Sequence, residues 1–251
     1  MATEPASQVE PRPLGEFSRL TGVFFEPGKT FTDIAERPAW FVPVVLAILV
    51  GIVYLYTFSV HIGWRRYIVK TMDANPRIAQ LTAEQRQRAV DLQLRFAPLA
   101  GYAGQVVAVP VYYLVTAGIL MGIIKGLLGV PLRFRQTFAV MSYASFLPRA
   151  IAVALSIAVM WLKNPDDFDL QNPILSNPGA LMSPDTPHKF LYSLAGSMDV
   201  FSIWTILLIA VGLKAAGGKR LSFGGALFAI VLPWAVYVLC RAAIVSIFNA
   251  G

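Results

Sequence analysis

Residues 39–60 read AWFVPVVLAILVGIVYLYTFSV, a stretch without a single charged side chain. A helix of about 20 apolar residues is long enough to cross the hydrocarbon core of a bilayer, which is roughly 30 Å thick. Trp40 lies at one end of the stretch, where aromatic side chains commonly sit at the level of the lipid headgroups. The stretch therefore predicts a membrane-spanning helix.

Four further apolar stretches follow, and together they predict an all-α polytopic membrane protein with a bundle of five transmembrane helices. The fourth stretch is the weakest, because its apolar part from Val200 to Leu213 is only about 14 residues long. It must borrow from the preceding SLAGSMD to cross, and otherwise it is re-entrant or buried. The expected spans are about residues 39–60, 97–124, 137–162, 198–214 and 223–248.

The composition of the whole chain points the same way. Hydrophobic residues make up 56% of the 251 residues and charged residues 14%, with a mean hydropathy of +0.61. A soluble domain carries about 25% charged residues, so a soluble monomer and a mainly disordered chain are both excluded. The net charge of +7 is expected to meet anionic lipid headgroups, and the absence of a basic stripe in a soluble module argues against nucleic-acid binding.

The charges of the linkers predict the orientation. The linkers 125–136 and 214–222 carry basic residues and no acidic ones, which is typical of cytoplasmic loops. The linker 163–197 is rich in aspartate and is expected outside. Five spans then place the N-terminus in the cytoplasm and the C-terminus outside. The linker 61–96 opposes this orientation with seven basic residues, but short loops carry the charge bias most strongly.

The residues before the first span divide into two parts. Residues 1–13 are polar and rich in proline, so we expect a disordered tail. Residues 14–38 are expected to form cytoplasmic amphipathic helices on the membrane surface, ahead of a membrane domain at 39–250. The pair Thr30 and Asp33 resembles a capping box at the start of the second of these helices. Apolar residues recur at helical spacing in the first helix, at Leu14, Phe17, Leu20 and Phe24.

A second capping signal lies in the linker between the first two spans. Thr82 and Gln85 have the S/T-x-x-E/Q spacing, which predicts a helix beginning there and running to about Phe96. Pro98 follows directly, and we expect the chain to bend there before it enters the second span.

Three charged residues fall within the predicted spans. Arg149 lies in the middle of the third span, where an ionised side chain costs about 2.5–3.5 kcal/mol on insertion scales. We therefore expect Arg149 to face inward, where it binds a substrate or satisfies carbonyl groups. Arg241 in the fifth span and Asp199 at the head of the fourth should lie at similar depth. They are expected to pair, unless Arg241 snorkels to the outer headgroups.

Prolines and glycines mark two further features of the spans. Pro110, Pro148 and Pro233 lie near the middle of three spans and are expected to kink them, lining a polar cavity or merely reflecting how common proline is in such helices. Gly118, Gly122 and Gly126 recur every four residues along the second span. Such a face allows close helix packing, either within the bundle or between two copies of the chain.

The sequence holds no pattern typical of catalysis. The stretch GVFFEPGKT, from Gly22 to Thr30, has one residue too many for a phosphate loop and two phenylalanines within it. His61 and His188 lie apart in different linkers, and Cys240 is the single cysteine, so no zinc-ligand set or nucleophile with a base is present. We expect no enzyme activity, no cofactor and no metal site.

Three stretches together resemble the bacterial branch of the Yip family, small membrane proteins with a Yip-one domain. They are LTGVFFEPGKTFTDIAERPAWFVPVVL, TFAVMSYASFLPRAI and MDVFSIWTILLIAVGLKAAGG. The resemblance covers about residues 20–248 and implies five spans, a cytoplasmic N-terminus and an external C-terminus. Eukaryotic members are linked to Rab GTPases and vesicle traffic, and they carry an Asp-Leu-Tyr-Gly-Pro motif before the first span. This chain lacks that motif, so Rab binding is not carried over.

Two functions are compatible with the sequence. The first is a non-enzymatic membrane protein of Yip type in the inner membrane, which organises the membrane or recruits partners through its N-terminal helix and glycine face. The alternative is a small transporter, channel or lipid scramblase with a polar path at Arg149 and the proline-kinked spans. The expected partners are membrane lipids and either a second copy of the chain or other membrane proteins.

Overall fold

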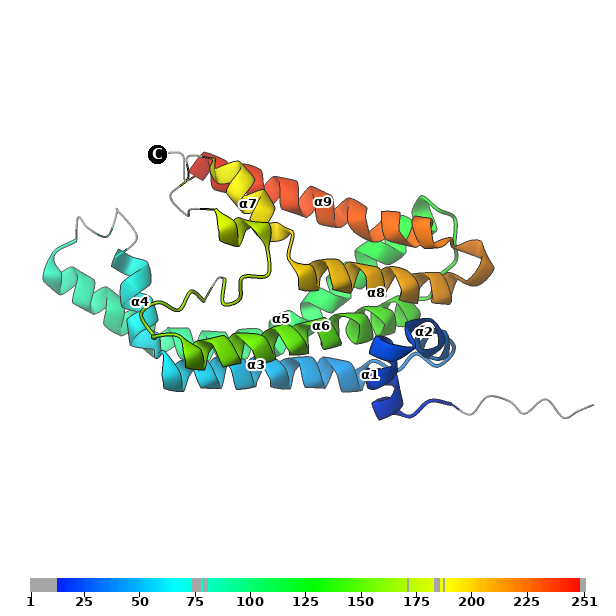
Figure 1. Ribbon diagram of the computed structural model, residues 1–251, viewed down its shortest axis with the longest axis horizontal. Coiled ribbons are helices and arrows are strands. Elements are labelled where there is room, and N and C mark those ends of the chain that lie inside the picture. Colours follow the sequence, from blue (N-terminus) through cyan, green and yellow to red (C-terminus); the bar gives the residue numbers. More distant parts are fainter. Residues whose placement is uncertain are drawn as a thin grey trace, which may run out of the picture.

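The computed structural model describes residues 13–73, 78, 81–170, 172–182, 186 and 188–248, and these residues form helices and no strands. The predicted tail at 1–13 lies, apart from Pro13, outside the described residues. In chain order (Figure 1) the elements are α1 (Glu16–Phe25), α2 (Pro27–Glu36), α3 (Phe41–His61), α4 (Trp64–Asp73), α5 (Ala83–Gly126), α6 (Phe134–Leu162), the 3-10 helix η2 (Pro178–Leu181), α7 (Lys189–Ser197), α8 (Val200–Gly217), the 3-10 helix η3 (Gly218–Arg220) and α9 (Phe223–Phe248).

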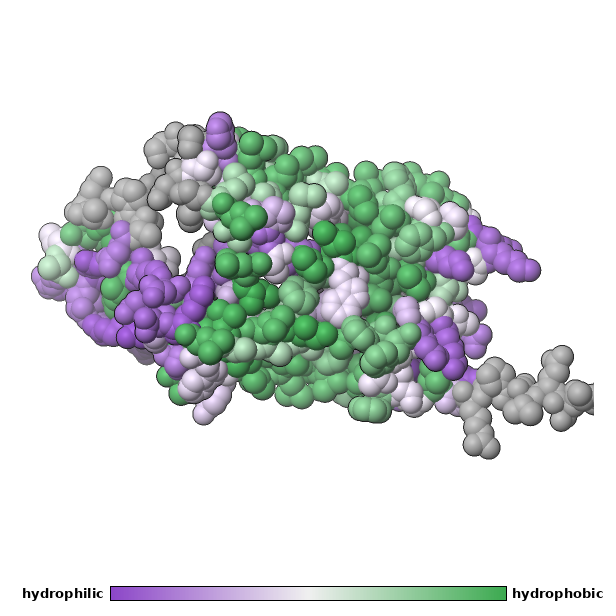
Figure 2. Space-filling view, in the orientation of Figure 1, coloured by the Kyte–Doolittle hydropathy of each residue, from purple (hydrophilic) through white to green (hydrophobic). Residues whose placement is uncertain are grey.

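In the described part of the chain, five helices are long and apolar enough to cross a membrane: α3, α5, α6, α8 and α9. They run side by side, with α6 packed against α3, α5 and α8. Their outward faces are apolar, as the broad green surface in Figure 2 shows. In water such a surface is unfavourable, whereas lipid tails solvate it. The predicted all-α polytopic bundle is confirmed.

Helix α5 is a single helix of 44 residues, about 66 Å at 1.5 Å per residue. It begins with the predicted capping box, in which Thr82 and Gln85 each bond the other's backbone N–H. The predicted helix end at about Phe96 is wrong, because α5 continues through Pro98, and the bend expected at Pro98 stays a prediction. A proline removes only one backbone hydrogen bond of a helix. Membrane helices tolerate this loss, because neighbouring helices and local adjustments satisfy the freed carbonyl group. The N-terminal part of α5 extends beyond the bundle and packs against α4.

The fourth candidate span is α8. The apolar stretch from Val200 to Leu213 continues as a helix to Gly217, so α8 has 18 residues and rises about 27 Å. Together with η3 it is long enough to cross a membrane. The chain breaks at Met198 and Asp199, so α7, which packs against α9, is a separate helix before this span.

Helix α2 packs against α8 and α6 at the end of the bundle. Phe31 is completely buried, and a side chain at Gly212 of α8 would overlap with Phe31 and with Val140 of α6. The predicted capping box at Thr30 and Asp33 is wrong, because α2 already begins at Pro27. Proline at the first position of a helix has the required φ angle and lacks only an N–H that would be unpaired anyway.

Candidate functional site

The N-terminal helices carry a buried arginine. The Arg19 residue is only 4% exposed, although its place in an amphipathic helix favours a solvent-facing position. Its guanidinium lies 2.7 Å from Asp33 Oδ2 of α2 and 3.4 Å from Glu16 Oε1 of its own helix. A buried charge is tolerated when it is paired and hydrogen-bonded in this way. Burial alone lowers the pKa of Arg19, but the hydrogen bonds with Asp33 and Tyr143 outweigh it and leave the pKa above its usual value.

The same network reaches the third span. The Tyr143 hydroxyl of α6 donates to Glu16 Oε2, and the backbone N–H of Leu14 donates to Asp33 Oδ1 at 3.2 Å. Gln136 at the start of α6 adds a second link, because its Nε2 donates to the Ala35 carbonyl at 2.9 Å. These bonds join α1 and α2 to α6.

One face of α1 stays uncovered. Phe17 is 78% exposed and Phe25 76% exposed. Phe24 is partly covered, because its ring packs in a T-shaped arrangement with Trp204 of α8, with the two ring centroids 5.7 Å apart. The hydrogen-bond network around Arg19 thus fixes α1 against α2 and α6, while the side chains of Phe17 and Phe25 remain exposed on its surface.

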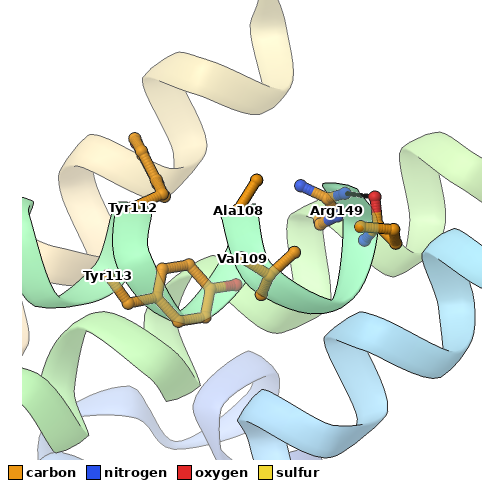
Figure 3. Close-up of a pocket in the computed structure, with 6 residues that line it drawn as sticks. Ala108, Val109, Tyr112, Tyr113 and Arg149 are labelled. Carbon is orange, nitrogen blue, oxygen red and sulfur yellow. Dashed lines mark hydrogen bonds between the residues drawn. The ribbon is translucent and has the colours of Figure 1, made fainter. Parts of the chain in front are cut away.

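A second site lies around Arg149. This residue is about 15 residues, or ~22 Å, from the start of α6, and its side chain is exposed and directed into a pocket between α5 and α6 (Figure 3). The inward-facing role expected for Arg149 stays a prediction. Its Nη2 donates to Gln105 Oε1 of α5 at 3.4 Å. Among the described residues no carboxylate forms an ion pair with it.

The pocket measures about 160 Å³ and has polar and apolar walls. The hydroxyl of Tyr113 and the Nε2 of Gln105 are buried and have no hydrogen-bond partner in the part of the chain that the structure describes. Gln105 lies over Gly51 of α3, where a Cβ would overlap with its side chain. The glycine therefore makes room for the amide beside Arg149. The lining residues are Gln105, Ala108, Val109, Tyr112, Tyr113 and Arg149.

A model of the Yip1 domain matches residues 21–244 of the chain. The chain belongs to the Yip1 family. The membership expected from the sequence is confirmed, and with the five apolar helices it makes the chain an integral membrane protein. Comparisons with curated proteins and with solved structures give no match. Asp33, Tyr143 and Arg149 lie within the matched range of this Yip1-family protein, whereas Glu16 and Arg19 precede it.

The ion pair predicted between Arg241 and Asp199 is absent from the part of this Yip1-family protein that the structure describes. Arg241 Nη1 instead donates to Ser197 Oγ at 3.4 Å. Asp199 caps α8, since its carboxylate accepts from the Ser202 backbone N–H at 3.2 Å and from Ser176 Oγ at 2.5 Å. An unpaired helix N-terminus so close to the membrane core is costly, and the capping aspartate relieves that cost.

The glycine face points away from the bundle. A Cβ added at Gly118, Gly122 or Gly126 would meet nothing within 4 Å, so packing of this face within the bundle is wrong and the dimer alternative stays a prediction. The helices α5, α6 and α9 continue through Pro110, Pro148 and Pro233. The described residues contain no group of three side chains that would hold a metal ion.

Sequence reasoning missed Arg19, Asp33, Gln105 and Tyr113 as parts of sites. Glu16 and Arg19 stand three residues apart, which is a common surface pair on a helix. No feature of the neighbouring sequence indicates that Asp33 of α2 lies beside Arg19. Gln105 is a polar side chain within an otherwise apolar stretch, and this signal, besides Arg149, pointed to the pocket.

Proposed function

We propose that this Yip1-family protein is a non-enzymatic protein of the inner membrane that organises the membrane or recruits partners through α1 and α2. The single observation that carries this proposal is the network around Arg19. It holds α1 against the bundle while Phe17 and Phe25 stay exposed. Exposed aromatic side chains on a fixed amphipathic helix are suited to binding lipid headgroup regions or an apolar patch of another protein.

The proposed orientation has the N-terminus in the cytoplasm and the C-terminus outside. Helices α1 and α2 lie near the end of the bundle at which α3 begins (Figure 1). The two basic linkers, 125–136 and 214–222, also lie at this end, because they connect α5 to α6 and α8 to α9. Linkers without acidic residues favour the cytoplasmic side, and this supports a cytoplasmic platform made of α1 and α2.

A photo-cross-linking amino acid tests the platform in intact cells expressing the full chain. It is placed at Phe17 or Phe25, and the control position is Thr32, which is exposed on α2. We expect discrete protein or lipid adducts at Phe17 and Phe25 and far fewer at Thr32. The adducts should weaken when Tyr143→Phe loosens the network. Equal labelling at all three positions would argue against the platform.

A second candidate function is the movement of a small solute or lipid across the membrane. The observation that favours it is the pocket at Arg149, a polar site near the middle of α6. Purified protein in liposomes is expected to support lipid or ion flux that falls in the folded Arg149→Gln variant. Full flux in that variant would exclude this role for Arg149.

A further inference from the structure

Three polar residues with unused hydrogen-bonding capacity line the pocket between α5 and α6. Arg149 carries five N–H donors, and its one hydrogen bond within the described part of the chain is a 3.4 Å bond to the neutral Gln105. The Tyr113 hydroxyl is buried and has no partner among the described residues, and the same holds for the Gln105 amide nitrogen, which lies against Gly51 of α3. Figure 3 shows the Tyr113 ring running beneath Val109 with its hydroxyl end toward the side on which Arg149 lies.

The charge of the pocket defines the chemistry of its ligand. The Arg149 side chain is a cation, and no carboxylate pairs with it in the described ranges. All three unused groups are able to donate hydrogen bonds. Water would satisfy donors but would leave the positive charge without a counter-charge in a hydrocarbon layer. An oxyanion supplies both the charge and several acceptor oxygens.

The size and opening of the pocket narrow the ligand further. A volume of about 160 Å³ corresponds to roughly five water molecules at ~30 Å³ each, which is room for a phosphate group but not for a whole phospholipid. Ala108 and Tyr112 on its rim are exposed, so the pocket opens toward the lipid-facing surface. The acyl chains of a lipid can therefore stay outside while its phosphate enters.

We propose that this pocket binds a phosphate-type oxyanion, with Arg149 as the charged donor and Tyr113 and Gln105 as neutral donors. A phosphate on a lipid and a free phosphate share this chemistry. The assignment does not depend on the platform formed by α1 and α2. It names the ligand for the second candidate function, and its physiological meaning rests on that function.

Binding is measured on the full chain by native mass spectrometry after release from nanodiscs. The probes are phosphatidylglycerol, the phosphate-free lipid diacylglycerol, and inorganic phosphate as a soluble competitor. We expect phosphatidylglycerol to be retained and diacylglycerol to be lost. Arg149→Gln should weaken retention at least about tenfold, because it removes hydrogen bonds from a charged donor, and Tyr113→Phe should weaken it about fivefold.

The matched control is Arg220→Gln, which removes one positive charge from an exposed position and should leave retention unchanged. If inorganic phosphate displaces the lipid and binds alone with the same dependence on Arg149, the site takes free oxyanions. If it does not displace the lipid, the ligand is the lipid phosphate. Equal retention in the wild type and in a folded Arg149→Gln protein overturns the assignment.

Two further arms keep the result interpretable. Arg149→Lys keeps the charge without the planar fork and should restore part of the binding. Tyr113→Phe removes one oxygen atom, so it tests the site even where Arg149→Gln does not fold, and unchanged retention in Tyr113→Phe then overturns the assignment. Flux in liposomes is scored separately, so binding without flux supports the site and rejects the transport function.

Discussion

Arg19 and Arg149 occupy opposite kinds of environment in the same molecule. Arg19 is buried between two helices and contacts two carboxylates, one of which Tyr143 anchors to a span. Arg149 is exposed in the middle of α6, and its one hydrogen bond to a described residue joins it to a neutral amide. This difference indicates that an arginine neutralised by carboxylates, such as Arg19, stabilises the packing of the helices around it. An arginine whose charge is left unpaired is available to a ligand.

The largest effect should come from Arg19→Gln, which leaves Asp33 and Glu16 without their cation. Removing one partner of a buried pair costs about 3–5 kcal/mol, so the free energy of unfolding should fall by about that amount. Thermal and denaturant unfolding of the purified full chain, followed by tryptophan fluorescence, measures it. The control Lys29→Ala breaks the exposed pair with Glu26 and should cost less than about 1 kcal/mol. Similar losses in both variants would contradict the stabilising role assigned to the buried contacts of Arg19.

The next largest effect is expected for Tyr143→Phe. The variant removes the hydroxyl that donates to Glu16 and keeps the ring. A hydrogen bond to a charged group contributes about 1.5–3 kcal/mol, so the loss should be smaller than for Arg19→Gln. A double-mutant cycle with Glu16→Gln, followed by the same unfolding measurement, should give non-additive losses. Strict additivity would show that the two residues do not interact.

Gly51→Ala should perturb the surroundings of Arg149 with a moderate cost. The new Cβ would overlap with the Gln105 side chain, and overpacking of this kind costs about 1–3 kcal/mol. Because Gln105 must turn away, retention of phosphatidylglycerol should weaken as well. Gly118→Ala is the matched control, since nothing lies within 4 Å of its new Cβ and both stability and retention should be preserved. Unchanged retention in Gly51→Ala would remove Gln105 from the site.

The smallest effect on stability is expected for Arg149→Gln, the same substitution as at Arg19. Within the described ranges its one hydrogen bond joins it to Gln105, so the free energy of unfolding should change by less than about 1 kcal/mol. Unfolding of the two glutamine variants in the same lipid measures the difference directly. A loss at Arg149 as large as the loss at Arg19 would give the two arginines the same structural role.

Several parts of the fold were predictable because their signals are local. Five long apolar stretches predict five spans, since the length and hydropathy of each helix are properties of its own residues. The cap at Thr82 and Gln85 was found for the same reason. The cap at Thr30 failed because Pro27 offers an earlier helix start a few residues away. Two local signals for a helix start, Pro27 and the Thr30–Asp33 pair, compete here, and the sequence alone does not show which of them is used.

The sites were less predictable, because their partners lie far apart in the chain. Glu16 meets Tyr143 across 127 residues, and Arg149 meets Gln105 across 44. The predicted partner of Arg241 was Asp199, yet both contact serines instead. Depth in the membrane suggested that pair, but depth says nothing about which faces of two helices meet.

The sequence by itself determined that this is a helical membrane protein with five apolar spans and an amphipathic N-terminal segment. Hydrophobicity and helical period are summed over neighbouring residues, and a bilayer accepts only segments that satisfy both. Only the tertiary structure decided that Arg19 is buried, that Arg149 opens to a pocket and that the glycine face is free. These outcomes depend on the rotation and register of packed helices, which distant contacts set.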